Sequence, residues 1–109
     1  FQAVATLAVG ASDSLLYTVP AGKTLFISTL SVSARGDAAA DRNSNQMCRL
    51  TVYNNTTTVY KSLVGGNGGA RLSLNKPIRI PASNQVVFTV WNLANHSQYL
   101  WLAAHGWEG

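Results

Sequence analysis

The spacing of apolar residues restricts the fold of this chain more than any other feature, because it repeats every two residues. In the segment 47–53, the apolar residues Cys48, Leu50 and Val52 alternate with residues that are mostly polar. The three-to-four-residue spacing of an amphipathic helix is almost absent, and the one helix-compatible stretch, 37–42, is short and polar. A period of two places alternate side chains on opposite faces of a strand. The pattern therefore predicts an all-β protein.

Residues that favour turns divide this pattern into short segments. The clearest turns are 20–23 (Pro-Ala-Gly-Lys) and 54–56 (Asn-Asn-Thr), because Pro fixes φ while Gly and Asn accept a left-handed backbone. Pro77 and Pro81 flank a short run that favours an edge strand or an extended crossover. About eight strands at this spacing are typical of a sandwich or barrel, and we predict a jelly-roll-like antiparallel β-sandwich. The expected strands are 2–9, 14–19, 24–34, 47–53, 57–64, 70–75, 85–92 and 98–107.

The alternation also assigns faces within two strands. In 24–34, one face carries Phe26, Leu30, Val32 and Ala34, and the other carries Leu25 and Ile27. In 98–107, one face carries Tyr99, Trp101, Ala103, His105 and Trp107, and the other carries Leu100, Leu102 and Ala104.

The composition fits one domain with few charges. The chain has 109 residues, so we expect a single domain over 1–109. Its one cysteine excludes an intrachain disulfide, and no apolar stretch reaches the ~20 residues of a membrane helix. Charged residues make up 11 % of the chain, against about 25 % in typical domains. A chain with so few charges favours a subunit of an assembly, in which other subunits cover part of its surface, although a compact extracellular domain can have the same composition.

The net charge of +4 arises from a shortage of acids. Eight Lys and Arg stand against four Asp and Glu, and the basic residues are scattered with no run among them. A nucleic-acid-binding surface requires basic residues clustered on one face. We therefore expect neither nucleic acid nor a membrane as a partner.

The residue types that catalysis needs are present without the grouping that it needs. The acids are Asp13, Asp37, Asp41 and Glu108, and the histidines are His96 and His105. A nucleophile requires a base beside it and a third group that orients the base. Cys48 lies on the apolar face of its strand, where a free thiol behaves as a small hydrophobic group. No zinc-ligand spacing occurs, and we predict a protein that is not an enzyme and that uses no metal or cofactor.

The segment 17–32 (Tyr-Thr-Val-Pro-Ala-Gly-Lys-Thr-Leu-Phe-Ile-Ser-Thr-Leu-Ser-Val) carries a resemblance to a known family. It resembles the opening hairpin of small β-sandwich proteins from tailed-phage particles, in which a TVPAGKT turn leads into a long strand. The closing segments 77–82 and 86–91 and the aromatic last strand, which ends Gly-Trp-Glu at 106–108, are similar as well. The resemblance implies a virion structural protein of a bacteriophage, such as a capsid decoration (cement) protein or a tail or fibre module.

The same resemblance implies the partners. Decoration proteins of this kind often form homotrimers on the capsid, in contact with the major capsid or another virion protein, and often extend an N-terminal arm onto a neighbouring subunit. The segment 1–9 suits that arm, because it is apolar on both faces; Phe1, Gln2, Val4 and Leu7 would then make the subunit or capsid contact. Alternatively, this segment is a central strand of the chain's own sandwich. Because the chain begins with Phe rather than Met, we expect a processed product or an excised fragment.

Two further features allow other functions. Tyr99, Trp101 and Trp107 form an aromatic stripe that fits a core or subunit interface, or else a stacking platform for a carbohydrate in a sugar-binding or host-attachment module. Arg35, Gly36 and Asp37 spell the tripeptide that integrins recognise on exposed loops, or they are an ordinary polar turn at the start of the longest connection. Virion localisation follows from the first function, and an extracellular location from the others.

Overall fold

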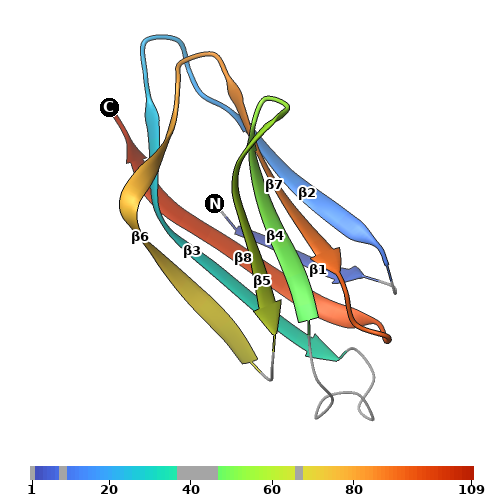
Figure 1. The fold of residues 1–109 in the computed structure, drawn as a ribbon. Helices are drawn as coiled ribbons and strands as arrows, with labels where there is room; N and C mark the ends of the chain where they lie inside the picture. Colours follow the sequence, from blue (N-terminus) through green and yellow to red (C-terminus); the bar gives the residue numbers. More distant parts are fainter. Residues whose placement is uncertain (1, 8–9, 37–46, 66–67) are drawn as a thin grey trace.

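The computed structural model describes residues 2–7, 10–36, 47–65 and 68–109, and these residues form strands and turns without a helix (Figure 1). Nothing in these ranges is therefore a helix long and apolar enough to cross a membrane. The strands are β1 (Gln2–Leu7), β2 (Ser12–Thr18), β3 (Leu25–Gly36), β4 (Met47–Asn54), β5 (Thr57–Gly65), β6 (Gly68–Ile80), β7 (Gln85–Asn92) and β8 (Gln98–Glu108).

The strands form two antiparallel sheets that lie face to face (Figure 1). Their orders are β1-β8-β3-β6 and β2-β7-β4-β5. Consecutive strands therefore lie in different sheets, except for β4 and β5, which are paired neighbours. The predicted all-β fold is confirmed, and its two layers are those of a β-sandwich.

The inner faces of both sheets supply the hydrophobic core. Leu30 of β3, Leu50 of β4, Phe88 of β7 and Leu100 of β8 are at most 1 % exposed. Each side chain of this kind contributes roughly 1.5–3 kcal/mol when it is removed from water. The apolar face predicted for β4 is confirmed by the burial of Cys48, Leu50 and Val52. In β7, the buried face consists of Val86, Phe88 and Val90.

A β-bulge in β3 makes one sequence prediction wrong. The pairing of β3 with both neighbours shifts between Ile27 and Thr29, so the alternation changes phase at Ser28. Leu25 and Ile27 therefore point into the core together with Leu30, whereas Phe26 is only partly buried. A strict period of two cannot show where an extra residue enters a strand.

Strand β6 lies at the edge of its sheet. Pro77 has no N–H to donate to a neighbouring strand, and a position at the edge does not require that donor. The sequence pattern separated 70–75 from the run after Pro77, but the structure joins both in one strand. Its pairing with β3 skips from Ile78 to Ser73, and residues 74–77 form the irregular part.

The two predicted turns are confirmed. Gly22 and Asn55 have positive φ values of 78° and 55°, and both residue types accept that conformation. The Pro20 carbonyl accepts a hydrogen bond from Lys23 N–H at 3.2 Å.

Strand β1 is paired along its whole length with β8 of the same chain. The alternative prediction, a strand of the chain's own sandwich, is confirmed for residues 2–7, but the strand lies at the edge of the sheet rather than at its centre. Among the described strands, β8 has β1 and β3 as its two neighbours, whereas β1 has β8 alone. Phe1 lies outside the described residues.

A buried polar network connects the start of β4 with the end of β7 and the start of β8. Gln98 is fully buried, and its Nε2 donates to the Met47 carbonyl at 2.8 Å and to Asn92 Oδ1. Its Oε1 accepts from Met47 N–H at 3.0 Å. Asn92 Nδ2 donates to the His96 carbonyl at 2.9 Å, which fixes the loop between β7 and β8. The sequence pattern placed Gln98 only as the first residue of a strand.

Candidate functional site

The outer face of β8 carries the predicted aromatic stripe. Register with β3 places Tyr99, Trp101 and Trp107 on the same face of the sheet, as the alternation predicted. Trp107 is 51 % exposed and Tyr99 37 % exposed, while Trp101 is partly buried. An aromatic row with this exposure is available for stacking against a ligand or a partner.

The sequence pattern missed a fourth aromatic residue on this face. The bulge at Ser28 turns Phe26 outward, and register pairs it directly with Trp107. The two rings stack with centroids 5.2 Å apart and an interplanar angle of 17°. Phe26 therefore holds one face of the Trp107 indole, and the half-exposed indole is fixed in orientation rather than free in solvent.

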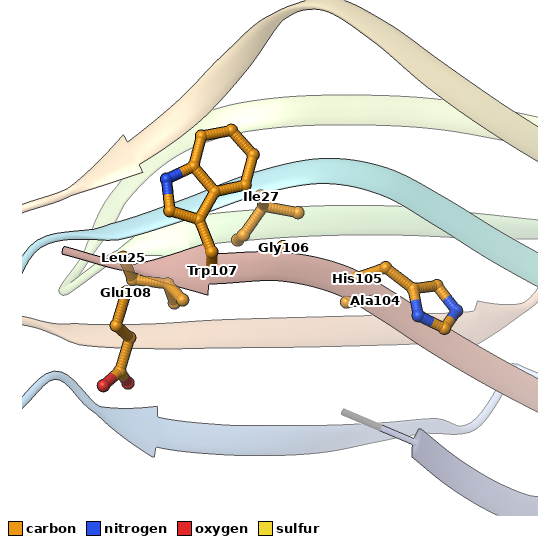
Figure 2. A pocket seen from close by; sticks show the side chains of 7 residues that line it. All are labelled: Leu25, Ile27, Ala104, His105, Gly106, Trp107 and Glu108. Atoms are coloured by element: carbon orange, nitrogen blue, oxygen red, sulfur yellow. The ribbon is translucent and has the colours of Figure 1, made fainter.

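A cavity of about 310 Å³ lies beside Trp107 at the C-terminal end of β8 (Figure 2). In Figure 2, the Trp107 indole and the Glu108 carboxylate point to opposite sides of β8, and His105 lies farther along the strand. This volume is near the lower limit for a small-molecule site. The residues that line the cavity include an indole (Trp107), an imidazole (His105) and a carboxylate (Glu108). The lining residues are Leu25, Ile27, Ala104, His105, Gly106, Trp107 and Glu108.

Gly106 determines how closely β8 approaches β3 at this cavity. A Cβ atom at this position would lie 1.8 Å from the Phe26 carbonyl oxygen. Only glycine allows the two backbones to lie this close beside the bulge. The signal in the sequence was the glycine inside an otherwise regular strand pattern.

Glu108 is already engaged by the other sheet. The hydroxyl of Tyr17 in β2 donates a hydrogen bond to Glu108 Oε1, which joins the two sheets at this end of the sandwich. The hydrogen bond to the Glu108 carboxylate raises the pKa of Tyr17, and desolvation and the carboxylate charge act in the same direction. The carboxylate therefore has a structural role beside the cavity.

The groups considered for catalysis lie on different elements: Cys48 on β4, His96 in the loop after β7 and His105 on β8. Cys48 is fully buried, and desolvation raises the pKa of its thiol to about 11, so the nucleophilic thiolate is suppressed at neutral pH. In the loop after β7, Nδ1 of His96 lies 3.2 Å from Oδ1 of Asn95. No group of three metal-ligating side chains occurs among the residues that the structure describes.

Two of the predicted sites have positions that differ from the expectation. Arg35 and Gly36 end strand β3, where they pair with Tyr99 and Gln98, so they do not begin a loop; Asp37 lies outside the described residues. Gln2, Val4 and Leu7 belong to β1. Their predicted contact with another subunit stays a prediction.

The outer face of the β2-β7-β4-β5 sheet carries an exposed apolar surface that the sequence pattern did not single out. Leu63 is 69 % exposed and Leu16 54 % exposed, and Met47, Val59 and the adjacent loop residue Leu93 are also exposed. These residues occupy positions that a polar residue normally fills in a sandwich. The sequence feature that could have revealed this surface is an apolar residue, in β2 and again in β5, at a position where the two-residue alternation points the side chain outward.

Comparison with known proteins gives no relative: no family model matches the chain, and no curated protein matches it either.

Proposed function

We propose that this chain is a non-enzymatic virion structural protein, a capsid decoration (cement) protein that stabilises a particle through subunit contacts. The observation that carries the proposal is the exposed apolar surface on the outer face of the β2-β7-β4-β5 sheet. Leu63 and Leu16 expose more than half of their surface in a chain with only 11 % charged residues. Leu63 lies on edge strand β5 and Leu16 on the opposite edge strand β2, with β4 and β7 between them. Large apolar side chains exposed on the outer face of a sheet are typical of surfaces that a partner covers.

The strand order supports this proposal at the level of architecture. The orders β1-β8-β3-β6 and β2-β7-β4-β5 support the proposed jelly roll, a fold used by viral capsid proteins and also by lectins. Fold alone does not specify function. The jelly-roll assignment therefore agrees with both functions considered for this chain and selects neither.

The proposed partners are further copies of this chain, with a trimer favoured, and the major capsid or another virion protein. Among the described strands, edge strand β1 is paired on one side only, so backbone groups on its other side are available to a strand of a neighbour. The pairing of β1 with β8 of the same chain does not by itself support the arm that the family resemblance implies. Virion localisation follows from the same proposal.

Light scattering of the purified chain, alone and with candidate capsids, tests the proposal. We expect an oligomer or particle binding that Leu63→Glu weakens, because the substitution places a charge in the apolar contact. Thr57→Glu is the matched control, since it adds the same charge at an exposed position of the same strand. A monomer that binds no particle would refute the proposal.

A carbohydrate-binding or host-attachment module is the second candidate. The observation that favours it is the half-exposed Trp107 indole, held by Phe26 beside the cavity of about 310 Å³. Titration with oligosaccharides should then quench tryptophan fluorescence in the native chain and not in Trp107→Ala. Absence of quenching by any sugar tested would reject this candidate and leave the structural role unaffected.

A further inference from the structure

Two buried hydrogen-bond donors without partners lie side by side on the outer face of the β2-β7-β4-β5 sheet. They are Nε of Arg49 and Nε1 of Trp91. Register pairs Arg49 of β4 directly with Trp91 of β7, and the guanidinium carbon lies 4.8 Å from the centre of the indole ring. Buried donors are nearly always satisfied in folded proteins, so a pair left unsatisfied at one place marks a site that the chain by itself does not complete.

The same place is hollowed and positively charged. A cavity of about 370 Å³ is lined by Arg49, Lys61, Ser62 and Leu63. Lys61 faces the same side as Arg49 from the neighbouring edge strand β5, at the diagonal position of the register. All of these groups can donate hydrogen bonds or carry positive charge, except the apolar Leu63.

Carboxylates are absent from this face among the described residues. Of the two acids in the described ranges, Glu108 accepts from Tyr17 at the end of the other sheet. Asp13 accepts from its neighbour Ser14 N–H and pairs with Val90, whose side chain points into the core. The guanidinium of Arg49 is therefore balanced by an aromatic face and by no described acid.

Large apolar side chains surround the charged centre. Leu63 lies directly beside Arg49 in the register and is 69 % exposed. Met47 precedes Arg49 on the same face of β4, and its carbonyl accepts from Leu93 N–H, so that the exposed Leu93 lies next to it. Aliphatic side chains of this kind match the apolar surface of a protein better than the hydroxyl-rich surface of a sugar.

We infer that this face binds an acidic segment of a partner protein: a carboxylate enters the cavity between Arg49 and Lys61, and apolar residues beside that carboxylate cover Leu63, Met47 and Leu93. The inference rests on the proposed function, and it names the surface and the chemistry of the partner. A planar guanidinium binds a carboxylate through two parallel hydrogen bonds. Turning Nε of Arg49 toward the ligand breaks no existing hydrogen bond of that atom, and it weakens the stacking contact with Trp91.

The direct test uses two short peptides as probes, N-acetyl-Leu-Glu-Leu-amide and N-acetyl-Leu-Gln-Leu-amide. Nuclear magnetic resonance follows the indole N–H of Trp91, identified with Trp91→Phe, and the Nε–H of Arg49. We expect the Glu peptide to shift both signals and the Gln peptide to bind at least about tenfold more weakly, as for loss of a hydrogen-bonded charge. Equal binding of both peptides, or no shift with either, would overturn the inference.

Matched variants and a sugar acid complete the test. Arg49→Gln should abolish the shift of the Trp91 signal, and Arg49→Lys should weaken binding because it keeps the charge without the planar geometry. Arg79→Gln makes the same change at an exposed position of the other sheet and should leave binding unchanged. If galacturonate shifts the signals as strongly as the Glu peptide at equal concentration, the site recognises a sugar acid and the protein partner is rejected.

The inference and the proposed function fail in different ways. If the native chain binds particles and Arg49→Gln binds them equally well, the assigned surface is wrong and the structural role remains. If the native chain binds the Glu peptide but neither oligomerises nor binds any particle, the site is present and the virion role is wrong.

Discussion

Replacement of Gln98 by Met should remove about 2–6 kcal/mol from the free energy of unfolding. Gln98 is fully buried and makes three hydrogen bonds, to Met47 N–H, to the Met47 carbonyl and to Asn92 Oδ1. The two acceptors keep other donors, because Leu93 N–H bonds the Met47 carbonyl and Ala94 N–H bonds Asn92 Oδ1. Met47 N–H loses the acceptor that Gln98 provides. A donor left without an acceptor costs about 1–3 kcal/mol, and each of the two other lost hydrogen bonds costs about 0.5–1.5 kcal/mol.

Urea unfolding followed by circular dichroism measures this loss, with an unchanged m value as the sign that the folded state is still compact. Leu100→Met is the control, because it places the same side chain at a buried position of the same strand and should cost under ~1.5 kcal/mol. A Gln98→Met variant as stable as Leu100→Met would refute the importance of the network.

Gln98→Glu sharpens the same prediction through pH. At neutral pH the buried carboxylate faces two acceptors and cannot donate, so its folded-state pKa is raised above the unfolded value near 4.3. An acid with a raised folded pKa destabilises the fold above the unfolded pKa, and its penalty disappears when both states are protonated. The stability difference from the native chain should therefore shrink as the pH falls from neutral toward about 4 and stay constant below it.

Three other perturbations test the rest of the structure. Gly106→Ala should destabilise the fold by about 3 kcal/mol, the upper end for overpacking, because its Cβ would meet the backbone of Phe26; native-like stability in urea would contradict the close approach. Cys48, with a pKa of about 11 and no exposed surface, should react with a thiol reagent at pH 8 only after unfolding, and rapid labelling of the native protein would contradict its burial. Glu108→Gln should lower the pKa of Tyr17 toward 10.0 in a spectrophotometric titration. In the native chain this hydrogen bond contributes stability below about pH 10 that is lost as the pH rises through the raised pKa, and a pH-independent difference between the two chains would exclude that linkage.

The all-β class and most of the strands were predictable from the sequence. Alternation in 47–53 assigned the buried residues of β4 correctly, because each side chain of a regular strand is placed by its own position in the period. Turn residues such as Gly22 and Asn55 marked the strand ends, since few other residues accept their positive φ. These features depend on neighbours in the sequence, which is why the sequence alone determines them.

Strand order, the bulge at Ser28 and the candidate sites depend on which segments meet in space. The outward position of Phe26 follows from a register shift between β3 and β8, and Gly106 opposite it matters only because the two backbones touch there. Arg49 and Trp91 are far apart in the sequence, and only the pairing of β4 with β7 brings their unsatisfied donors together. Local alternation contains no information about such long-range pairing, so only the tertiary structure decides where this domain presents its binding surfaces.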